Sequence, residues 1–334
     1  MPKISVCIPT YNTAKYLPEA IESVLAQEFT DYELVICDNA STDETPQLCR
    51  GYDDPRIRYV RFDEFVGQAA NWNRCLDLAT CEYIVLLHAD DILRPAFLKR
   101  AATALDHDSE VGLVHCSVQH IGQTGEPLHT QKLYDRDRTD NGEVTFRRLL
   151  LEGCVVNPAG VMVRRDLYKR VGRFTEEIVW GVDWHMWMRI ALRSKTAYLA
   201  ETLAEYRQHA QSGTSGVMAE ARNGKDEMWM LDDIFSIVPA GDAHLHALRK
   251  RAVRQSAHRT WCFAEELCRL GFMPAARANI KKSVGIHPAM VFSGRVWTLW
   301  LATYFGYGWF ERVHAWRHRL APEHTTPGLD SKPL

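Results

Sequence analysis

The stretch Ile4-Ser5-Val6-Cys7-Ile8-Pro9-Thr10-Tyr11-Asn12 begins as an apolar run and ends in polar residues. Its apolar part, residues 4–8, predicts a buried β-strand, because β-branched residues favour strands and Pro9 cannot continue the pairing inside a sheet. A helical pattern follows, with the apolar residues Leu17, Ile21, Val24 and Leu25 on one face. A strand that leads at once into a helix is typical of a βαβ arrangement around a mainly parallel sheet.

The same alternation of short strands and helical patterns continues to about residue 115. Further strands are predicted at 33–37, 57–60 and 83–87. Residues 119–142 are polar and rich in turn formers, which predicts a loop, and residues 220–320 have a mostly helical pattern. We therefore predict an α/β protein with a single Rossmann-like mixed sheet flanked by helices, followed by a C-terminal mostly helical extension.

The composition of the whole chain excludes several classes of protein. The 334 residues carry a formal net charge of −2, so nucleic acid, which is normally bound by a basic surface, is not an expected partner. The nine cysteines form no Cys-x-x-Cys pair, which argues against a zinc ribbon. The sequence has neither a secretory signal nor an apolar run of about eighteen residues, so we expect a cytoplasmic protein.

Polar residues follow three of the predicted strands where each strand ends: Thr10-Tyr11-Asn12, Asp38-Asn39 and His88-Ala89-Asp90-Asp91. Ligands of open α/β sheets bind outside the carboxyl ends of the strands, so we expect these residues to line one binding edge. Carboxylates at a rigid strand end suit Mg²⁺ or Mn²⁺, because these ions prefer oxygen ligands. A structural interpretation stays open, in which Asp90 and Asp91 cap the helix predicted from about Pro95.

Three segments in the same order and spacing, 5–12, 35–43 and the Asp-Asp pair after the fourth strand, resemble family 2 glycosyltransferases of the GT-A fold. The resemblance extends from about residue 3 to about residue 215. It implies transfer of a sugar from a nucleoside diphosphate sugar to a hydroxyl of a glycan or lipid-linked saccharide. The implied mechanism is a single displacement that inverts the anomeric carbon. A UDP-sugar is the expected donor, because the family commonly uses one, and surface polysaccharide synthesis is the expected setting.

The resemblance also divides the chain. It implies a nucleotide-sugar-binding half at 1–115 and an acceptor-side half at 116–219, both within the GT-A domain. Residues 220–334 lie outside the resemblance and form the predicted helical region.

The implied reaction assigns a divalent ion, Mn²⁺ or Mg²⁺, to the diphosphate leaving group, whose negative charge it neutralises. The resemblance places that ion on Asp90, with support from Asp91 and from His209 of a Tyr-Arg-x-His segment. Ser212 and Thr214 then belong to a loop that closes over the donor. His88 departs from the family, which usually has an aspartate there, and we expect its imidazole to contact the nucleotide.

Other residues match the donor-binding motifs of the family. Tyr11 is expected to supply an aromatic face near the base and Asp38 to accept hydrogen bonds from the base or ribose. Gly67 permits close approach of a backbone, and Arg74 could meet phosphate or lie on a solvated helix face. Packing of Tyr11 under its own loop also stays open. The full set expected to bind the nucleotide sugar is Pro9, Thr10, Tyr11, Asn12, Asp38, Asn39, Asp43, Gly67, Asn71, Arg74, His88, Ala89 and Asp90.

The acceptor hydroxyl must lose a proton as it attacks, so a carboxylate is the expected general base. Gly181-Val182-Asp183-Trp184 resembles the motif in which the family carries this base, which assigns the role to Asp183. The alternative is that Asp183 is the N-cap of the following helix, a position that aspartate favours.

Residues 289–320 combine many aromatic side chains with a basic end. Aromatic rings and arginines together suit a membrane interface, which would fit a peripheral enzyme on the inner face of the cell membrane that acts on lipid-linked acceptors. Two other interpretations stay open: these side chains pack onto the catalytic part, or they form the contact of a homodimer.

Two other functions compete with the transferase. A sugar-phosphate nucleotidyltransferase would share the sheet and the metal, but it normally needs a glycine-rich, basic loop after the first strand. Residues 9–12 contain neither glycine nor lysine. A catalytically degenerate protein that binds glycan or nucleotide is the third function, and His88 makes it conceivable.

Overall fold

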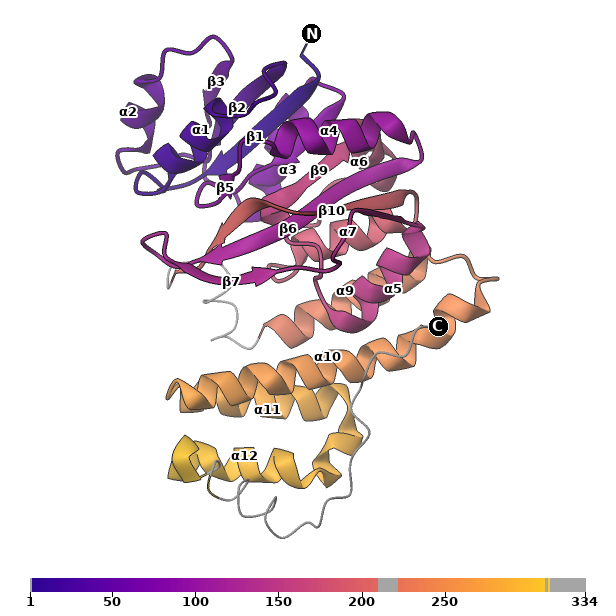
Figure 1. Ribbon diagram of the computed structural model, residues 1–334. Coiled ribbons are helices and arrows are strands. Elements are labelled where there is room, and N and C mark those ends of the chain that lie inside the picture. The colour runs from indigo at the N-terminus through magenta and orange to yellow at the C-terminus, as the bar shows by residue number, and fades with distance from the viewer. Residues whose placement is uncertain (1, 210–221, 310–311, 313–334) are drawn as a thin grey trace. The chain divides into compact units, whose positions relative to one another are not determined.

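The computed structural model describes residues 2–209, 222–309 and 312, and it divides into two compact units (Figure 1). Met1–Ser215 and Trp229–Ala252 belong to the first unit, and Gly216–Met228 and Val253–Leu334 to the second. The first unit contains the sheet, and the described part of the second is helical. The α/β fold with a helical C-terminal part is thus confirmed, whereas the boundaries at 115 and 219 stay predictions.

A mixed sheet of ten strands forms the centre of the first unit. Its order is β3-β2-β1-β4-β9-β6-β10-β5, with β7 paired to β6 and β8 paired to β10. The strands β1 to β4 are parallel neighbours, β9 is antiparallel to β4 and β6, and β10 is parallel to β6. The strands are β1 Ile4–Thr10, β2 Tyr32–Asp38, β3 Ile57–Arg61, β4 Tyr83–Leu86, β5 Ile92–Leu93, β6 Val111–Ile121, β7 Pro127–Gln131, β8 Arg138–Asp140, β9 Val161–Arg164 and β10 Lys195–Arg207.

Helices follow each of the first three strands, as the alternating pattern predicts (Figure 1). The helices are α1 Leu17–Leu25, α2 Thr45–Arg50, α3 Gln68–Leu78, α4 Phe97–His107, α5 Gly142–Glu152, α6 Arg165–Val171, α7 Val182–Ala191, α9 Asn223–Ile237, α10 Ala243–Arg269, α11 Met273–Ile286 and α12 Gly294–Phe305. Short 3₁₀ turns, η1 Pro158–Gly160 and η2 Pro288–Phe292, precede β9 and α12.

Burial of β1 on both faces explains its continuous apolar sequence. Ile4, Val6 and Ile8 are fully buried, and so are Ser5 and Cys7 on the opposite face of the strand. Strands of this kind occur in parallel sheets that helices cover on both sides. The predicted apolar face of α1 is also confirmed, because Leu17, Ile21 and Val24 are fully buried.

Residues 119–142 do not form the predicted loop. β6 continues to Ile121, and β7 and β8 add two short strands within the segment. Both short strands are largely exposed to solvent. The loop prediction was wrong because a strand without a buried face does not need alternating apolar residues.

The predicted helical pattern after residue 220 is confirmed for the described residues, which form α9 to α12. In the second unit, α11 and α12 bury Ile280, Val296 and Leu299 in one core with Trp261 of α10. No helix in the described ranges is long and apolar enough to cross a membrane.

Candidate donor site and catalytic carboxylate

The carboxyl ends of β1, β2 and β4 lie beside one another in the sheet. Thr10 pairs with Asp38 in register, and Cys7 pairs with Leu86, the last residue of β4. The polar residues that follow these strands are therefore gathered along one edge, as the sequence predicts. The strand does not stop at Pro9, as the sequence predicted, because Pro9 and Thr10 still pair with Cys37 and Asp38 of β2. Thr10 is buried and Pro9 half-buried.

The loops after β1 and β2 are tied together by Asn12. Its side-chain oxygen accepts hydrogen bonds from the backbone of Thr42 at 2.8 Å and of Asp43 at 3.3 Å, and its own N–H donates to Ser41 at 2.9 Å. Asn12 has a φ of 52°, a left-handed conformation that asparagine adopts more readily than most residues. Asp43 in turn accepts from the N–H of Ala14 at 3.1 Å. The two predicted donor-binding loops are thus a single hydrogen-bonded unit.

Asp38 and Asn39 lie buried beneath these loops. Asp38 accepts hydrogen bonds from the Ser41 N–H and from the Tyr59 hydroxyl. The amide of Asn39 exchanges two hydrogen bonds with the backbone of Val66, at 2.7 and 2.9 Å. Both residues therefore position the loops on either side of them, in addition to any contact that they make with a ligand.

Arg74 belongs to the same network. Its guanidinium donates to Asn39 and to the Glu64 carbonyl, at 2.9 and 3.1 Å, and lies 4.1 Å from the centre of the Phe62 ring. The solvated-face interpretation is therefore wrong, and Arg74 braces the segment that leads to α3. Contact with phosphate stays a prediction.

Two exposed aromatic rings flank the entrance to these loops. Tyr11 is 43% exposed, and its ring centre lies 4.5 Å from that of Phe65, which is 59% exposed. Exposed rings of this kind can stack on a planar ligand. If Tyr11 only packed under its own loop, its ring would not need to be exposed. Gly67 precedes α3 as its N-cap, with open space where a Cβ would project. Asn71 is buried, and its Oδ1 has no hydrogen-bond partner among the described residues.

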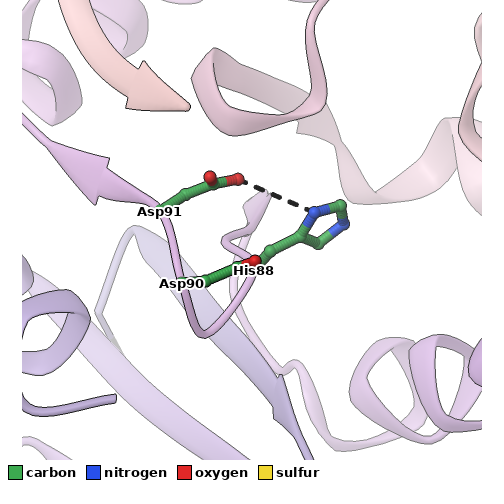
Figure 2. A group of neighbouring side chains, drawn as sticks. All are labelled: His88, Asp90 and Asp91. Atoms are coloured by element: carbon green, nitrogen blue, oxygen red, sulfur yellow. Dashed lines mark ion pairs between the residues drawn. The ribbon is translucent and has the colours of Figure 1, made fainter. Parts of the chain in front are cut away.

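The turn after β4 brings His88, Asp90 and Asp91 together, and Figure 2 shows the imidazole facing the Asp91 carboxylate. One ligand atom from each lies within 4.8 Å of the others. The His88 Nδ1 is 3.7 Å from Asp91 Oδ2, and the His209 Nε2 is 3.0 Å from Asp90 Oδ2. Ala89 between them is buried in the core. The predicted metal residues therefore meet, with His209 reaching Asp90.

The surroundings of Asp91 show whether the three side chains of this turn suit a cation. Its side chain is 1% exposed, and its Oδ2 has no hydrogen-bond partner within the described ranges. Burial, together with the neighbouring Asp90, raises the pKa of the Asp91 carboxyl well above its usual range. A buried carboxylate oxygen without a donor is unfavourable unless a cation or proton meets it. Two carboxylates with such an oxygen fit Mg²⁺ or Mn²⁺.

Arg207 holds this turn in place from β10. Its buried guanidinium donates to the Asp90 carbonyl at 3.0 Å and pairs with Glu19 of α1 at 2.5 Å. Its backbone N–H donates to Asp91 Oδ1 at 3.0 Å. The Tyr16 ring lies against both Arg207 and His209, with centre distances of 5.1 and 4.9 Å. The turn is thus fixed by residues from α1 and β10 as well as by β4.

The alternative in which Asp90 and Asp91 cap a helix is wrong. β5 follows them, and α4 begins only at Phe97, with Ala96 as its N-cap and no side-chain cap. The N-cap alternative for Asp183 is wrong as well, because Gly181 occupies that position with a φ of 72°. Asp183 lies instead in the first turn of α7, where a carboxylate is favoured by the helix dipole.

Asp183 lies within electrostatic reach of His88 of the turn after β4. Burial raises the pKa of the Asp183 carboxyl, and a backbone hydrogen bond from Trp184 and the neighbouring His88 oppose that rise. His88 itself stacks on Trp72 of α3, with ring centres 5.1 Å apart and planes at 20°. The His88 imidazole thus lies beside Asp91 and acts electrostatically on Asp183.

Several site residues were not predicted from sequence: Glu19, Phe65, Trp72 and Arg207 as a brace. Arg207 belongs to the Tyr-Arg-x-His segment, so this motif could have identified it from the sequence. Glu19 and Trp72 are ordinary helix residues whose roles depend on contacts across the fold. Ser212 and Thr214 lie outside the described residues.

The single mixed sheet flanked by helices, with a helical C-terminal part, is similar to the fold of GT-A glycosyltransferases. The family model described as "Glycosyl transferase family 2" matches residues 5–172, about half of the chain. The chain therefore belongs to glycosyl transferase family 2 and is a glycosyltransferase.

Known proteins are similar to this chain in sequence or in fold. The chain is 30% identical over 250 residues to the uncharacterized protein MT1568 of Mycobacterium tuberculosis. The aligned region covers 70% of this chain and 77% of that protein. Its fold is similar to S. aureus TarS 1-349 in complex with UDP-GlcNAc, with a TM-score of 0.63, 19% identity and coverage of 96% and 93% of the two chains. It is also similar to the mannosyltransferase PcManGT from Pyrobaculum calidifontis in complex with GDP-Man and Mn²⁺, with a TM-score of 0.56, 18% identity and coverage of 95% and 88%.

Proposed function

We propose that this glycosyltransferase moves a sugar from a UDP-sugar to a hydroxyl of a glycan or lipid-linked saccharide during surface polysaccharide synthesis. The observation that carries the proposal is the meeting of Asp90, Asp91 and His88 beside the donor loops, with Asp183 in electrostatic reach of His88. A diphosphate and a base that activates a hydroxyl must lie close together for a direct displacement. The complex of TarS with UDP-GlcNAc supports UDP as the nucleotide.

Asp183 is the proposed general base. Its first-turn position in α7 fixes the direction of the carboxylate, and its raised pKa makes the carboxylate a stronger base than an ordinary aspartate. The acceptor hydroxyl gives its proton to Asp183 as its oxygen forms a bond with the anomeric carbon. The bond from that carbon to the diphosphate breaks at the same time, on the opposite face, so the configuration inverts.

Asp90 and Asp91 are the proposed ligands of Mn²⁺ or Mg²⁺, and His209 supports Asp90. Such an ion, when bound, neutralises the charge that develops on the leaving diphosphate. Asp91 would then gain the partner that its buried Oδ2 otherwise lacks. The complex of PcManGT with GDP-Man and Mn²⁺ supports this type of ion. His88, held flat against Trp72, is proposed to contact the nucleotide.

The donor-binding residues are proposed as two groups. Tyr11 and Phe65 form an exposed aromatic pair for the base, and Asp38 and Asn39 lie beneath the joined loops as candidates for contact with base or ribose. Thr10, Asn12, Asp43 and the segment from Gly67 to Arg74 complete the set by shaping these loops.

Release of nucleoside diphosphate from a panel of nucleotide sugars, with and without Mn²⁺, tests the proposal. We expect metal-dependent release of UDP that is stimulated by a glycan acceptor and lost in Asp183→Asn. Release of pyrophosphate from UTP and a sugar 1-phosphate would identify a nucleotidyltransferase instead. Donor binding without turnover, measured by thermal shift across the panel, would identify a binding protein.

A membrane surface is the second proposal, and it concerns α12. Phe292, Trp297, Leu301, Tyr304 and Phe305 are between 41% and 89% exposed, and four of them recur along one face of the helix. We call these five residues the apolar stripe. Exposed rings at this spacing are typical of helices that lie in a membrane interface. A peripheral enzyme could thereby reach a lipid-linked acceptor.

Charge supports an anionic lipid surface over a second copy of the chain. Residues 267–309 contain no aspartate or glutamate, and their cations are Arg269, Arg277, Lys281, Lys282 and Arg295. Arg277 lies 4.8 Å from the Tyr304 ring and Lys281 lies 5.7 Å from the Trp300 ring, so positive charge borders the stripe. Two copies of such a surface would repel each other. The basic residues after 312 lie outside the described residues.

A further inference from the structure

A second pocket lies in the first unit, lined by residues of α6, α7 and α9 and away from the proposed donor site. Its volume is about 420 Å³, and its lining includes Arg170, Arg189, Arg193, His185 and Asp233. Positions 185 and 189 follow one face of α7, Arg193 comes just after that helix, and positions 229, 233 and 237 follow one face of α9. Two helix faces and the end of α6 therefore enclose it.

Positive charge dominates this pocket. Among the described residues that line it, Asp233 is the single carboxylate, and its Oδ2 is already bound by the His185 Nε2 at 2.8 Å. Arg170 has only a distant contact with Asp166, at 3.9 Å. Three arginines thus line a pocket whose one carboxylate is already hydrogen-bonded to His185. Guanidinium groups that converge in this way match phosphate oxygens in charge and shape.

Two lining residues are built into the wall of the pocket. The His185 side chain is only 2% exposed, and its Nδ1 has no hydrogen-bond partner among the described residues. Arg189 is half-buried, and its guanidinium donates to the Arg173 carbonyl at 2.9 Å. Gly172, with a φ of 88°, permits this approach, because a Cβ there would lie 2.6 Å from Arg189 Nη2. The arginine is therefore held in place before any ligand binds.

We propose that this pocket binds a ligand that carries a phosphate group. The ligand would place its phosphate between Arg189 and Arg193, beside the wall that His185 and Asp233 form. Trp229 and Ile237 supply apolar surface beside the arginines. An adjoining hollow of about 780 Å³ shares Arg170, Arg193 and Ile237, so the organic part of a ligand has room.

The site is separate from the transfer chemistry but belongs to the same helix. Successive residues of an α-helix are about 100° apart, so positions 183 and 185 point to nearly opposite faces of α7. His88 acts electrostatically on Asp183, whereas His185 is hydrogen-bonded to Asp233. A phosphate ligand would thus bind the reverse face of the helix that carries the proposed base. The inference does not depend on the proposed reaction.

Phenyl phosphate is the probe, titrated by calorimetry into the full chain without metal and with UDP in excess to occupy the donor site. We expect binding that is about tenfold weaker in Arg193→Gln and again in Arg189→Gln/Arg193→Gln. Arg136→Gln, which removes an exposed arginine elsewhere, is the matched control. Because Arg193 is exposed, its replacement should leave the melting temperature unchanged.

Vesicles distinguish a free phosphate from a lipid headgroup. Binding to phosphatidylcholine vesicles that contain phosphatidic acid, lost in Arg193→Gln but not in Arg136→Gln, would identify a headgroup even if phenyl phosphate fails to bind. Binding of phenyl phosphate with the same dependence would identify a soluble ligand. If neither probe binds in a manner that depends on Arg193, the proposal is wrong.

Discussion

The turn after β4 and the face of α12 depart from ordinary protein architecture in opposite ways. Around the turn, charged side chains are buried: Asp91 is 1% exposed and Arg207 is 2% exposed. On α12, large apolar side chains are exposed, and Phe305 reaches 67%. Buried charge and exposed apolar surface are the two observations that distinguish a functional region from the rest of a globular protein.

The two regions differ in where their side chains find partners. The buried charges are largely paired within the protein, through Glu19, Arg207 and the carbonyl of Asp90, so the turn is rigid before a ligand binds. The apolar stripe is not covered by any of the described residues, and we propose that lipid covers it. Variants of the first region should therefore change turnover without changing membrane binding, and variants of the second should do the reverse.

Replacement of the proposed base should have the largest effect. Asp183→Asn keeps the shape of the side chain but cannot accept the proton, so we expect kcat to fall by about 10³- to 10⁴-fold, with little change in binding to vesicles. Steady-state transfer of a radiolabelled sugar measures this. Asp135→Asn, at a side chain that is 97% exposed, is the control. A loss of less than about tenfold would remove Asp183 from the role of base.

Removal of Asp90, the proposed leading metal ligand, comes next. Asp90→Ala should lower kcat by about 10²- to 10³-fold, because charge on the departing diphosphate is less well neutralised. The apparent affinity for Mn²⁺, measured from the dependence of rate on its concentration, should weaken in parallel. Unchanged dependence on Mn²⁺ would exclude Asp90 as a ligand. Substitution of Arg207 is a poorer test, because breaking a buried ion pair costs about 3–5 kcal/mol and could unfold the site.

The rate should depend on pH through Asp183. Because burial raises the pKa of this carboxyl, the active carboxylate is lost as pH falls through that raised value, and kcat/KM should then fall by about tenfold for each pH unit. Above the raised pKa the rate should be level. His88→Ala removes a neighbour that lowers this pKa, so the acid limb should move to higher pH. A limb at the position of an ordinary aspartate in both proteins would contradict the assignment.

The apolar stripe should control binding to lipid. Trp297→Ser/Phe305→Ser should weaken binding to vesicles of phosphatidylcholine and phosphatidylglycerol by about tenfold or more, since each ring loses favourable burial. Co-sedimentation measures this, and kcat with a soluble acceptor should not change. Leu128→Ser/Val144→Ser, also exposed, is the matched control. A shift from dimer to monomer in the stripe variant, with vesicle binding unchanged, would identify a second copy as the partner.

The smallest effect is expected at His88, which lies beside the proposed metal ligand Asp91. His88→Asp adds a third carboxylate beside Asp90 and Asp91, so metal-dependent activity should be preserved or rise, within about a few-fold at saturating Mn²⁺. Assays across a range of Mn²⁺ concentration measure this. Complete loss of activity would show that the imidazole stacked on Trp72 has a role that a carboxylate cannot replace.

The sequence alone predicted the helices and strands that have a strong apolar pattern. The buried runs of β1, β2 and β4 predicted the sheet, and the polar residues after them predicted its binding edge, including Asp38, Asp90 and Asp91. Weakly buried β7 and β8 were missed because neither face of these strands needs apolar residues. Trp72 could not be identified as the partner of His88, because helical spacing shows that a residue faces the core but not what it touches.

The ion pair between Arg207 and Glu19 has a consequence for how the molecule folds. Its two residues are 188 positions apart in the chain, and Arg207 also contacts the Asp90 turn. Contacts between residues so distant in sequence form late, because a long loop must close before they give any stabilisation. The strands β1 to β4 can pair before β10 joins the sheet, but the turn that carries Asp90 and Asp91 cannot be held in its final position until then. The proposed metal site is therefore completed only after almost the whole of the first unit has assembled.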